Sequence, residues 1–283
     1  MNSPSAAFLN LRERLSGFSA FESSSLLNLW VLCLSRDCGE ICGIPNFQDL
    51  WSCFAEALSA LYQPMAARKK KDESMKHARE AFGITLLKSG HRDIRRLKRK
   101  HEPSIHGTKN WNTSLLIMSY LEENPLKKKT PVLDVGCGWG PVGIYCSKVQ
   151  KAKVVCMDAD DEVFPFLKLH SEINEAPLNY FQSRYEKLTL SELSDYKLIT
   201  GADICFWDEL IKPLWKMIQK AMDAGVKEIL ISDPGRSPFE EVAKKAAKKY
   251  DAKKMHMTLD EPSVNGYVLR IRPKKKAKAK KGV

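Results

Sequence analysis

The stretch Pro131-Val-Leu-Asp-Val-Gly-Cys-Gly-Trp-Gly-Pro-Val-Gly-Ile-Tyr145 decides the fold of this chain. Its apolar residues 132–135 predict a buried strand. The glycines that follow predict a tight turn with positive φ, which a ligand can approach closely because no Cβ stands in the way. Pro141 favours the first turn of a helix, whose free amide groups attract an anionic group. The stretch therefore predicts a strand, a ligand-binding turn and a helix.

Short apolar runs continue to alternate with helical patterns over the following residues. We predict an α/β fold: a Rossmann-like, doubly wound seven-stranded sheet with an antiparallel last strand. The expected strands are 132–135, 153–157, 178–181, 202–206 and 227–232, followed by a hairpin of 253–259 and 267–272. The expected helices are 113–121, 141–148, 161–174, 209–224 and 238–250.

Composition divides the chain into four parts. Residues 1–67 contain no lysine and are rich in Leu, Ser and Cys. We expect a helical N-terminal extension there, which lies outside the native fold if the native protein starts at Met65 or Met75. The other parts are a basic helical segment over 68–105, the α/β domain over 106–272 and a disordered Lys-rich tail over 273–283.

The net charge of +12 is concentrated in two segments. Residues 68–100 hold thirteen basic and four acidic residues, and residues 270–283 hold eight basic residues and no acidic one. The rest of the chain is mildly acidic. Because both basic segments lie outside the glycine turn, they predict docking rather than chemistry. RNA, a ribosome or an acidic protein would dock through 68–100 and 273–283.

The cysteines and the apolar runs exclude further classes of protein. No Cys-x-x-Cys pair is present, and the spacing of Cys33, Cys38, Cys42 and Cys53 matches neither a zinc ribbon nor an iron–sulfur site. We therefore predict free thiols, no metal and a cytoplasmic location. The longest apolar run near the N-terminus, 26–34, is too short to span a bilayer, so no membrane contact is expected.

Two carboxylates accompany the glycine turn. Asp134 stands two residues before Gly136, and Asp158 ends the second expected strand, where it can accept hydrogen bonds from both hydroxyls of a ribose. Gly138-Trp-Gly-Pro-Val-Gly143 also satisfies the dinucleotide pattern G-x-G-x-x-G. Asp134 would repel a pyrophosphate, whereas it suits a ligand that carries an ammonium and a sulfonium. The residues favour S-adenosylmethionine, with a dinucleotide as the alternative.

Asp134-Val-Gly-Cys-Gly-Trp-Gly140 resembles the D/E-x-G-x-G-x-G motif of class I, seven-β-strand S-adenosylmethionine-dependent methyltransferases. The resemblance covers about residues 106–272. It implies that the glycines lie against the methionine part of the cofactor, that Asp158 holds the ribose and that Tyr185 contacts the adenine. The cofactor-binding residues that we expect are Trp111, Asp134, Gly136, Gly138, Gly140, Asp158, Tyr185 and Asp203.

Three further features resemble the protein lysine methyltransferase branch of that family. Trp111 precedes a helix, as does a pocket-lining Trp of the branch. Asp203-Ile-Cys-Phe206 resembles its D/E-x-x-Y/F motif, with Phe in place of the commoner Tyr. Asp233-Pro-Gly-Arg236 is similar to a stretch of the electron-transfer-flavoprotein lysine methyltransferases. The resemblance implies methyl transfer to a lysine nitrogen of a protein.

Methyl transfer from a sulfonium is an in-line displacement, so it depends on positioning and needs no nucleophile on the protein. We expect Asp203, Asp208 and Glu209 to form an acidic rim that binds the acceptor ammonium, with Asp208 relaying its proton. The catalytic residues are then Asp203, Phe206 and Asp208. An RNA methyltransferase, a small-molecule methyltransferase and a non-enzymatic module that binds S-adenosylmethionine or a dinucleotide remain as alternatives.

Overall fold

A seven-stranded sheet forms the centre of this computed structural model, which describes residues 76–104 and 106–274. The predictions for residues 1–67 and for 275–283 lie outside the described residues. The strands are β3 (Pro131–Val135), β4 (Lys153–Asp158), β5 (Asn179–Gln182), β6 (Leu198–Ala202), β7 (Glu228–Asp233), β8 (Asp251–Leu259) and β9 (Val264–Arg272). Their order across the sheet is β5-β4-β3-β6-β7-β9-β8.

The strands from β3 to β7 pair in parallel, and β9 is antiparallel to both of its neighbours. This confirms the predicted Rossmann-like sheet with an antiparallel last strand. The chain order reverses between β3 and β6, which lie side by side. In open α/β sheets such a reversal leaves a crevice at the carboxyl ends of the two strands.

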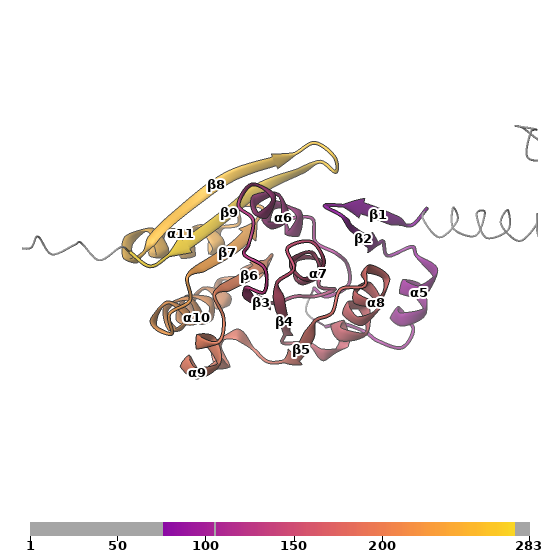
Figure 1. Cartoon of the computed structure of the whole chain (residues 1–283), viewed down its shortest axis with the longest axis horizontal. Helices are drawn as coiled ribbons and strands as arrows, with labels where there is room; N and C mark the ends of the chain where they lie inside the picture. Colours follow the sequence, from indigo (N-terminus) through magenta and orange to yellow (C-terminus); the bar gives the residue numbers. More distant parts are fainter. Residues whose placement is uncertain (1–75, 105, 275–283) are drawn as a thin grey trace, which may run out of the picture. The chain divides into compact units, whose positions relative to one another are not determined.

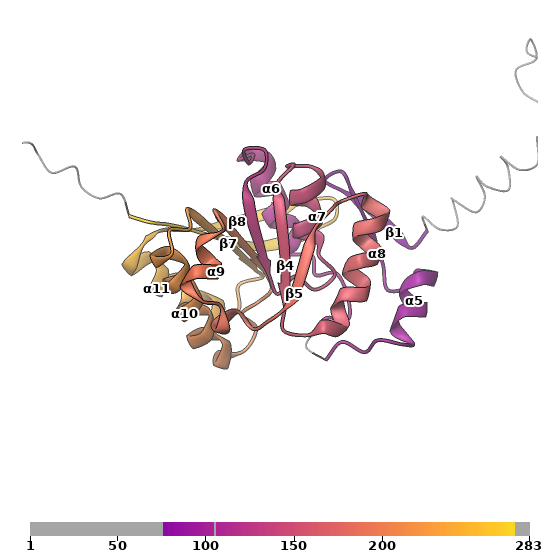
Figure 2. The same cartoon turned by 60° about the horizontal axis from the view of Figure 1, so that its bottom comes forward.

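Helices cover both faces of the sheet (Figures 1 and 2). Alternate residues of the buried strands point to opposite faces, as Leu230 and Ile231 of β7 do, so each face has its own apolar core. One core contains α6 (Ser114–Glu123), α7 (Pro141–Lys148) and α8 (Phe164–Asn174). The other contains α9 (Leu190–Ser194), which the sequence analysis missed, α10 (Ile211–Asp223) and α11 (Ser237–Lys249).

The strand predicted at 202–206 is wrong, because β6 runs over Leu198–Ala202. Asp203 ends it with a φ of 57°, a left-handed conformation that is rare for a residue with a Cβ. Ile204 and Cys205 are buried, but in the loop that follows. The two consecutive apolar runs look alike in sequence, so hydrophobicity alone does not locate the end of the strand.

Of the basic helical segment predicted over 68–105, the structure describes 76–104, and there only α5 (Arg92–Lys98) is a helix. Before it lies an antiparallel hairpin of β1 (Ala78–Ala81) and β2 (Ile84–Leu87). Its two turn residues, Phe82 and Gly83, have φ of 50° and 74°. Two successive positive φ angles match the right-handed twist of a hairpin and exclude a continuous helix. The division of the chain into domains stays a prediction.

Two buried polar side chains of α8 pair with the outer edge of β2. Asn174 Oδ1 accepts a hydrogen bond from the Thr85 amide at 2.7 Å, and Asn174 Nδ2 donates to the Thr85 carbonyl at 2.9 Å. His170 Nε2 accepts from the Leu87 amide at 3.1 Å, and its Nδ1 donates to the Phe166 carbonyl at 2.8 Å. These side chains take the place of a third strand, so the hairpin is fixed to α8.

His170 is expected to make the fold sensitive to acid. Burial lowers its pKa to about 4, because desolvation disfavours the charged ring. The unfolded ring titrates near pH 6.5, so the contribution of the neutral ring to stability is complete above that pH and is lost progressively as the pH falls to about 4. Between about pH 7 and about pH 5 this loss amounts to about 2 kcal/mol.

The variant His170→Gln should lose that part of the pH dependence, although it is less stable at neutral pH because it no longer bridges β2 and α8. Urea unfolding of both proteins at the two pH values measures the difference. Equal losses of unfolding free energy on acidification would show that His170 is not the group that titrates.

Candidate functional site

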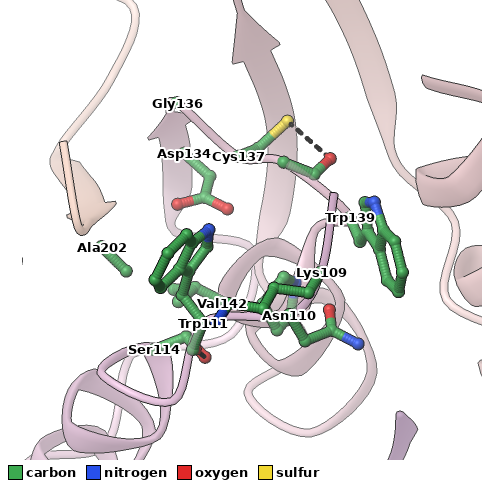
Figure 3. A pocket seen from close by; sticks show the side chains of 12 residues that line it. Lys109, Asn110, Trp111, Ser114, Asp134, Gly136, Cys137, Trp139, Val142 and Ala202 are labelled. Carbon is green, nitrogen blue, oxygen red and sulfur yellow. Dashed lines mark hydrogen bonds between the residues drawn. The ribbon is translucent and has the colours of Figure 1, made fainter. Parts of the chain in front are cut away.

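A pocket lies at the carboxyl ends of β3 and β6, where the chain order of the sheet reverses (Figure 3). It encloses about 350 Å³ of empty space, its open mouth included. Its walls come from three places: the end of β3 with the glycine turn, the end of β6, and the segment that leads into α6. The lining residues are Lys109, Asn110, Trp111, Ser114, Asp134, Gly136, Cys137, Gly138, Trp139, Pro141, Val142 and Ala202.

The three glycines of the turn all have positive φ, but they face different surroundings. A Cβ on Gly136 would lie 2.6 Å from Ile204 Cγ2, and one on Gly140 would lie 2.0 Å from Leu167 Cδ1. A Cβ on Gly138, at a φ of 54°, would meet no atom within 4 Å. Gly136 and Gly140 are therefore needed for packing, whereas Gly138 leaves a bare stretch of backbone open to a ligand.

Asp158, at the end of β4, braces this turn. Its Oδ2 accepts a hydrogen bond from the Gly138 amide at 2.8 Å, and its Oδ1 accepts from the Asp160 amide at 3.1 Å. Burial raises the pKa of its carboxyl group, against the effect of these hydrogen bonds. Each carboxylate oxygen has a second lone pair, so Asp158 can still accept hydrogen bonds from a diol.

Asp134 is a buried carboxylate in the pocket wall. Thr200 Oγ1 donates to its Oδ1 at 2.7 Å, and the Gly143 amide donates to its Oδ2 at 3.1 Å. Burial raises its pKa to about 7, with these two hydrogen bonds opposing the shift. Figure 3 shows the carboxylate on the side of the Trp111 indole. A cationic ligand in the pocket would favour the ionised form of Asp134.

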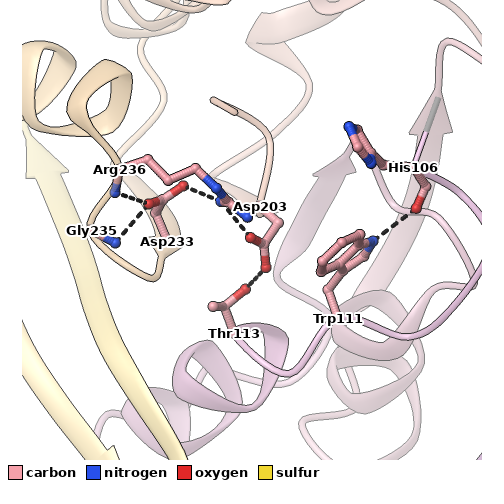
Figure 4. Close-up of polar contacts among 7 residues, drawn as sticks. All are labelled: His106, Trp111, Thr113, Asp203, Asp233, Gly235 and Arg236. Atoms are coloured by element: carbon pink, nitrogen blue, oxygen red, sulfur yellow. Dashed lines mark hydrogen bonds and ion pairs between the residues drawn. The ribbon is translucent and has the colours of Figure 1, made fainter. Parts of the chain in front are cut away.

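Trp111 lines the pocket, as predicted, at the entrance to α6. Its indole Nε1 donates to the His106 carbonyl at 2.8 Å, and the Lys109 ammonium lies 4.3 Å from the centre of its ring. Thr113, two residues on, joins the entrance of α6 to the loop after β6, because its hydroxyl donates to Asp203 (Figure 4).

Asp203 is held by an ion pair. Arg236 Nη1 donates to Asp203 Oδ1 at 2.6 Å and also to Asp233 Oδ2 at 2.8 Å. The amides of Gly235 and Arg236 donate to Asp233 Oδ1. Both carboxylates are buried, so one guanidinium neutralises two acids (Figure 4). The structure thus engages Asp203 with Thr113 and Arg236 and leaves Asp208 and Glu209 exposed.

Aromatic side chains form a rim beside Trp111. The ring of His106 lies 4.6 Å from that of Phe206 and 5.4 Å from that of Trp207, centre to centre, and 5.9 Å from Trp111. Trp207 is 53% exposed, which is unusual for so large an apolar side chain. Asp208 follows it directly, at the start of the short 3-10 helix η3 (Asp208–Leu210).

Residues 93–250 match the model of the lysine methyltransferase family, over more than half of the chain. This chain belongs to the lysine methyltransferase family. Similar curated proteins include an electron transfer flavoprotein beta subunit lysine methyltransferase homolog from Caenorhabditis elegans, 25% identical over 162 residues. That match covers 53% of this chain and 66% of the relative.

The electron transfer flavoprotein beta subunit lysine methyltransferase of Danio rerio is 29% identical over 133 residues, which are 46% of this chain and 50% of the relative. The chain thus spans about half to two thirds of the length of these relatives. Among solved structures, precorrin-6y C5,15-methyltransferase from Geobacter metallireducens is similar, with a TM-score of 0.47 and 12% identity. The match covers 62% of this chain and 95% of that one.

Six of the predicted site residues are not among the residues that line the pocket: Gly140, Asp158, Tyr185, Asp203, Phe206 and Asp208. Tyr185, in the 3-10 helix η2 (Tyr185–Lys187), donates a long hydrogen bond of 3.5 Å to the Ile204 carbonyl, and burial raises the pKa of its phenol. The ring of Phe206 contacts the ring of His106, which in turn contacts the ring of the pocket residue Trp111. The predicted roles of Tyr185 and Phe206 stay predictions.

Trp139, which stands between two glycines of the turn, is a lining residue that was not predicted. Its indole is buried, stacks on Phe166 with 4.9 Å between ring centres and donates to the Gly107 carbonyl at 2.8 Å. It thereby ties the glycine turn to the segment before α6. Lys109, Asn110 and Ser114 were not predicted either, because isolated polar residues at the start of a helix give no signal until the fold places them in a pocket.

The described part of the chain offers no group of three or more His, Cys, Asp or Glu side chains that could hold a metal ion. Within the same residues, no helix is both long and apolar enough to cross a membrane. Cys137, Cys146, Cys156 and Cys205 are free and buried.

Proposed function

We propose that this chain transfers a methyl group from S-adenosylmethionine to the side-chain nitrogen of a lysine in a protein. One observation carries the proposal: the pocket at the carboxyl ends of β3 and β6 combines the bare backbone of Gly138 with the buried carboxylate of Asp134, and the half-buried carboxylate of Asp158 holds the Gly138 amide, in a chain of the lysine methyltransferase family. A bare glycine gives room for close approach, and the carboxylates suit a ligand that carries hydroxyls and positive charge. The residues present therefore fit this cofactor.

S-adenosylmethionine supplies a methyl group on a sulfonium that is already activated for displacement. The contribution of this chain is to bind the cofactor and the acceptor and to orient them for the displacement. Gly138 gives close access to the backbone of the turn, Asp158 would accept the ribose hydroxyls, and Asp134 would balance the positive charge. Trp111 lines the pocket on the side of α6.

The aromatic rim suits a lysine acceptor. An ammonium binds favourably on aromatic faces, and exposed carboxylates nearby attract it. Because Asp203 is engaged by Arg236, the proton of the acceptor passes to a different group in this proposal. Asp208 and Glu209 have no hydrogen-bond or ion-pair partner through their side chains among the described residues. We assign the proton to Asp208, which directly follows the rim residue Trp207.

The acceptor class can be tested with radiolabelled S-adenosylmethionine and an extract from cells that lack this protein. We expect the label to enter macromolecules that protease removes and nuclease leaves intact. Label in RNA or in a small molecule would overturn the assignment of a protein acceptor, and no transfer to any fraction would favour a binding module. The same proposal places the protein in the cytoplasm, in keeping with its buried free thiols.

In that assay, Asp208→Asn should lower turnover about 100-fold, since general-base catalysis typically contributes at least that much. Affinity for S-adenosylmethionine should change less than about twofold, because Asp208 is not part of the pocket lining. The matched control is Glu209→Gln, one residue on and also exposed, which should leave turnover at saturating acceptor close to the wild-type value. If the two substitutions lowered turnover equally, Asp208 would not be the group that accepts the proton.

A further inference from the structure

Exposed basic side chains cover the outer surface of α5, the short helix beside α8 (Figures 1 and 2). We call this surface the α5 patch, and its members are Arg92, Arg95, Arg96, Lys98, Arg99 and Lys100. The acidic residue among them, Asp93, lies 3.8 Å from a nitrogen of Arg92 and 3.8 Å from one of Arg96. Arg95, Arg99 and Lys100 have no ion-pair partner among the described residues. The patch is therefore far from neutralised by the protein itself.

The charges of the α5 patch repel one another. Arg92 and Arg96 are four residues apart, as are Arg95 and Arg99, so each pair places like charges side by side and destabilises the helix. Arg92 is also the first residue of the helix, where the helix dipole favours an anion. A negatively charged partner would relieve both effects.

The inner side of α5 packs behind the glycine turn. Ile94 is fully buried in a small apolar cluster that also contains Trp139, a residue that lines the pocket, and Phe166 of α8. The Lys98 ammonium lies 5.7 Å from the centre of the Trp139 ring. These contacts hold the α5 patch in a fixed position relative to the pocket.

The chain that leaves α5 follows the carboxyl end of the sheet. The amide and the hydroxyl of Ser104 donate to Asp160 Oδ2 at 2.5 and 3.1 Å, and the Asp160 amide donates to Asp158 at the end of β4. Five residues separate Lys100 from His106 of the aromatic rim. Since an extended chain spans at most about 3.6 Å per residue, the end of the α5 patch lies within about 22 Å of the rim.

The aromatic rim carries the opposite charge. Asp208 and Glu209 are exposed there, directly after Trp207. An RNA would fit the α5 patch but not the rim, because these two carboxylates would repel its phosphates. Residues 92–100 also include no aromatic side chain on which a base could stack. A protein that presents a lysine to the rim and acidic side chains to the α5 patch satisfies both surfaces.

We propose that the α5 patch is a docking surface for the protein acceptor, which it recognises through a cluster of aspartate and glutamate side chains near the methylated lysine. Four of its six basic groups are guanidinium groups, which can each form two parallel hydrogen bonds with a carboxylate. Along an extended acceptor segment, the acidic cluster begins within about seven residues of the lysine. The inference rests on the proposed function, which supplies the lysine acceptor.

The binding test uses the full chain and short fluorescein-labelled peptides. One peptide carries a lysine followed by a run of glutamates, and the second has glutamine at every glutamate position. An RNA oligonucleotide with the same net charge as the glutamate peptide represents the other class of partner. Fluorescence anisotropy gives the dissociation constants. We expect the glutamate peptide to bind at least about tenfold more tightly than the glutamine peptide at low salt, and to lose this advantage at high salt.

The deciding variant combines Arg95→Gln with Arg99→Gln. Both side chains are exposed and unpaired among the described residues, so the fold should be kept. We expect this double variant to bind the glutamate peptide at least about fivefold more weakly than the wild type. The matched control, Lys244→Gln with Lys248→Gln, removes two exposed charges at the same spacing from α11, which packs on the other face of the sheet. It should change the affinity by less than about twofold.

The labelling assay with cell extract gives a second readout. The Arg95→Gln and Arg99→Gln double variant should need about fivefold more extract for half-maximal labelling of protein, and it should reach the wild-type maximal rate. This split is expected because the two arginines contribute to docking and lie outside the pocket lining.

The docking surface is wrong if the glutamate peptide does not bind the wild-type protein better than the glutamine peptide does. It is also wrong if the α5 and α11 double variants lose affinity equally. Tighter binding of the RNA, with the larger loss for RNA in the α5 double variant, would assign the surface to nucleic acid and overturn the proposal. All three results leave the proposed function standing. If the glutamate peptide binds through the α5 patch but no fraction of the extract is labelled, the proposed function fails while the surface still binds acidic protein.

Discussion

Replacing Gly138 with alanine is expected to abolish cofactor binding and to leave the fold nearly intact. The new Cβ would meet no protein atom within 4 Å, so it would stand in open space at a residue that lines the pocket. The left-handed φ of 54° costs alanine only about 1 kcal/mol. A cofactor that must lie against this backbone would clash with the methyl group, and we expect its affinity to fall at least about 100-fold, as titration calorimetry would measure.

Gly140→Ala is the matched variant with the opposite outcome. Its Cβ would lie 2.0 Å from Leu167 Cδ1, so α8 would have to move. Overpacking of this kind, together with a φ of 78°, should reduce the unfolding free energy by about 2–4 kcal/mol. If Gly138→Ala bound the cofactor as the wild type does, the cofactor would not lie on the glycine turn.

Arg236→Met is expected to destabilise the fold by about 3–5 kcal/mol, as loss of one partner from a buried ion pair does. The guanidinium is the shared partner of Asp203 and Asp233, whose side chains are 6% and 0% exposed. Without it, two buried carboxylates face each other with no balancing charge. Burial already raises the pKa of Asp233, so protonation at lower pH should restore part of the lost stability.

The measurement is urea unfolding at neutral and mildly acidic pH. Lys245→Met is the control, since it removes the ion pair with Glu241 on the same helix, where both side chains are about half exposed. Exposed pairs of this kind contribute less than about 1 kcal/mol. If the two variants lost the same stability, Arg236 would be an ordinary surface residue, and the anchoring of the Asp203 loop would need another explanation.

The glycine turn could be predicted from sequence because its chemistry is local. Strand, glycines and helix start follow one another within fifteen residues, and Asp158 ends the next strand. The end of β6 could not be predicted in this way. Asp203 stops the strand in a left-handed conformation that Thr113 and Arg236 hold in place, and both partners are far away in the sequence.

The β1–β2 hairpin illustrates the same limit. Its short strands are rich in residues that also favour helices, and His170 and Asn174 of α8 supply hydrogen bonds to its edge. Such support exists only in the folded chain. Asn110 likewise becomes a pocket residue only because Leu87 holds its amide, so loop polarity alone gives no hint of it.

The most direct measurement of the central claim identifies the atom that receives the methyl group. Proteins that become labelled by the wild-type chain with S-adenosylmethionine would be digested and sequenced by mass spectrometry. We predict methylation at the Nζ atom of lysine, and no such modification with Gly138→Ala under the same conditions. Methylation at another residue type, or lysine methylation that survives in Gly138→Ala, would contradict the account.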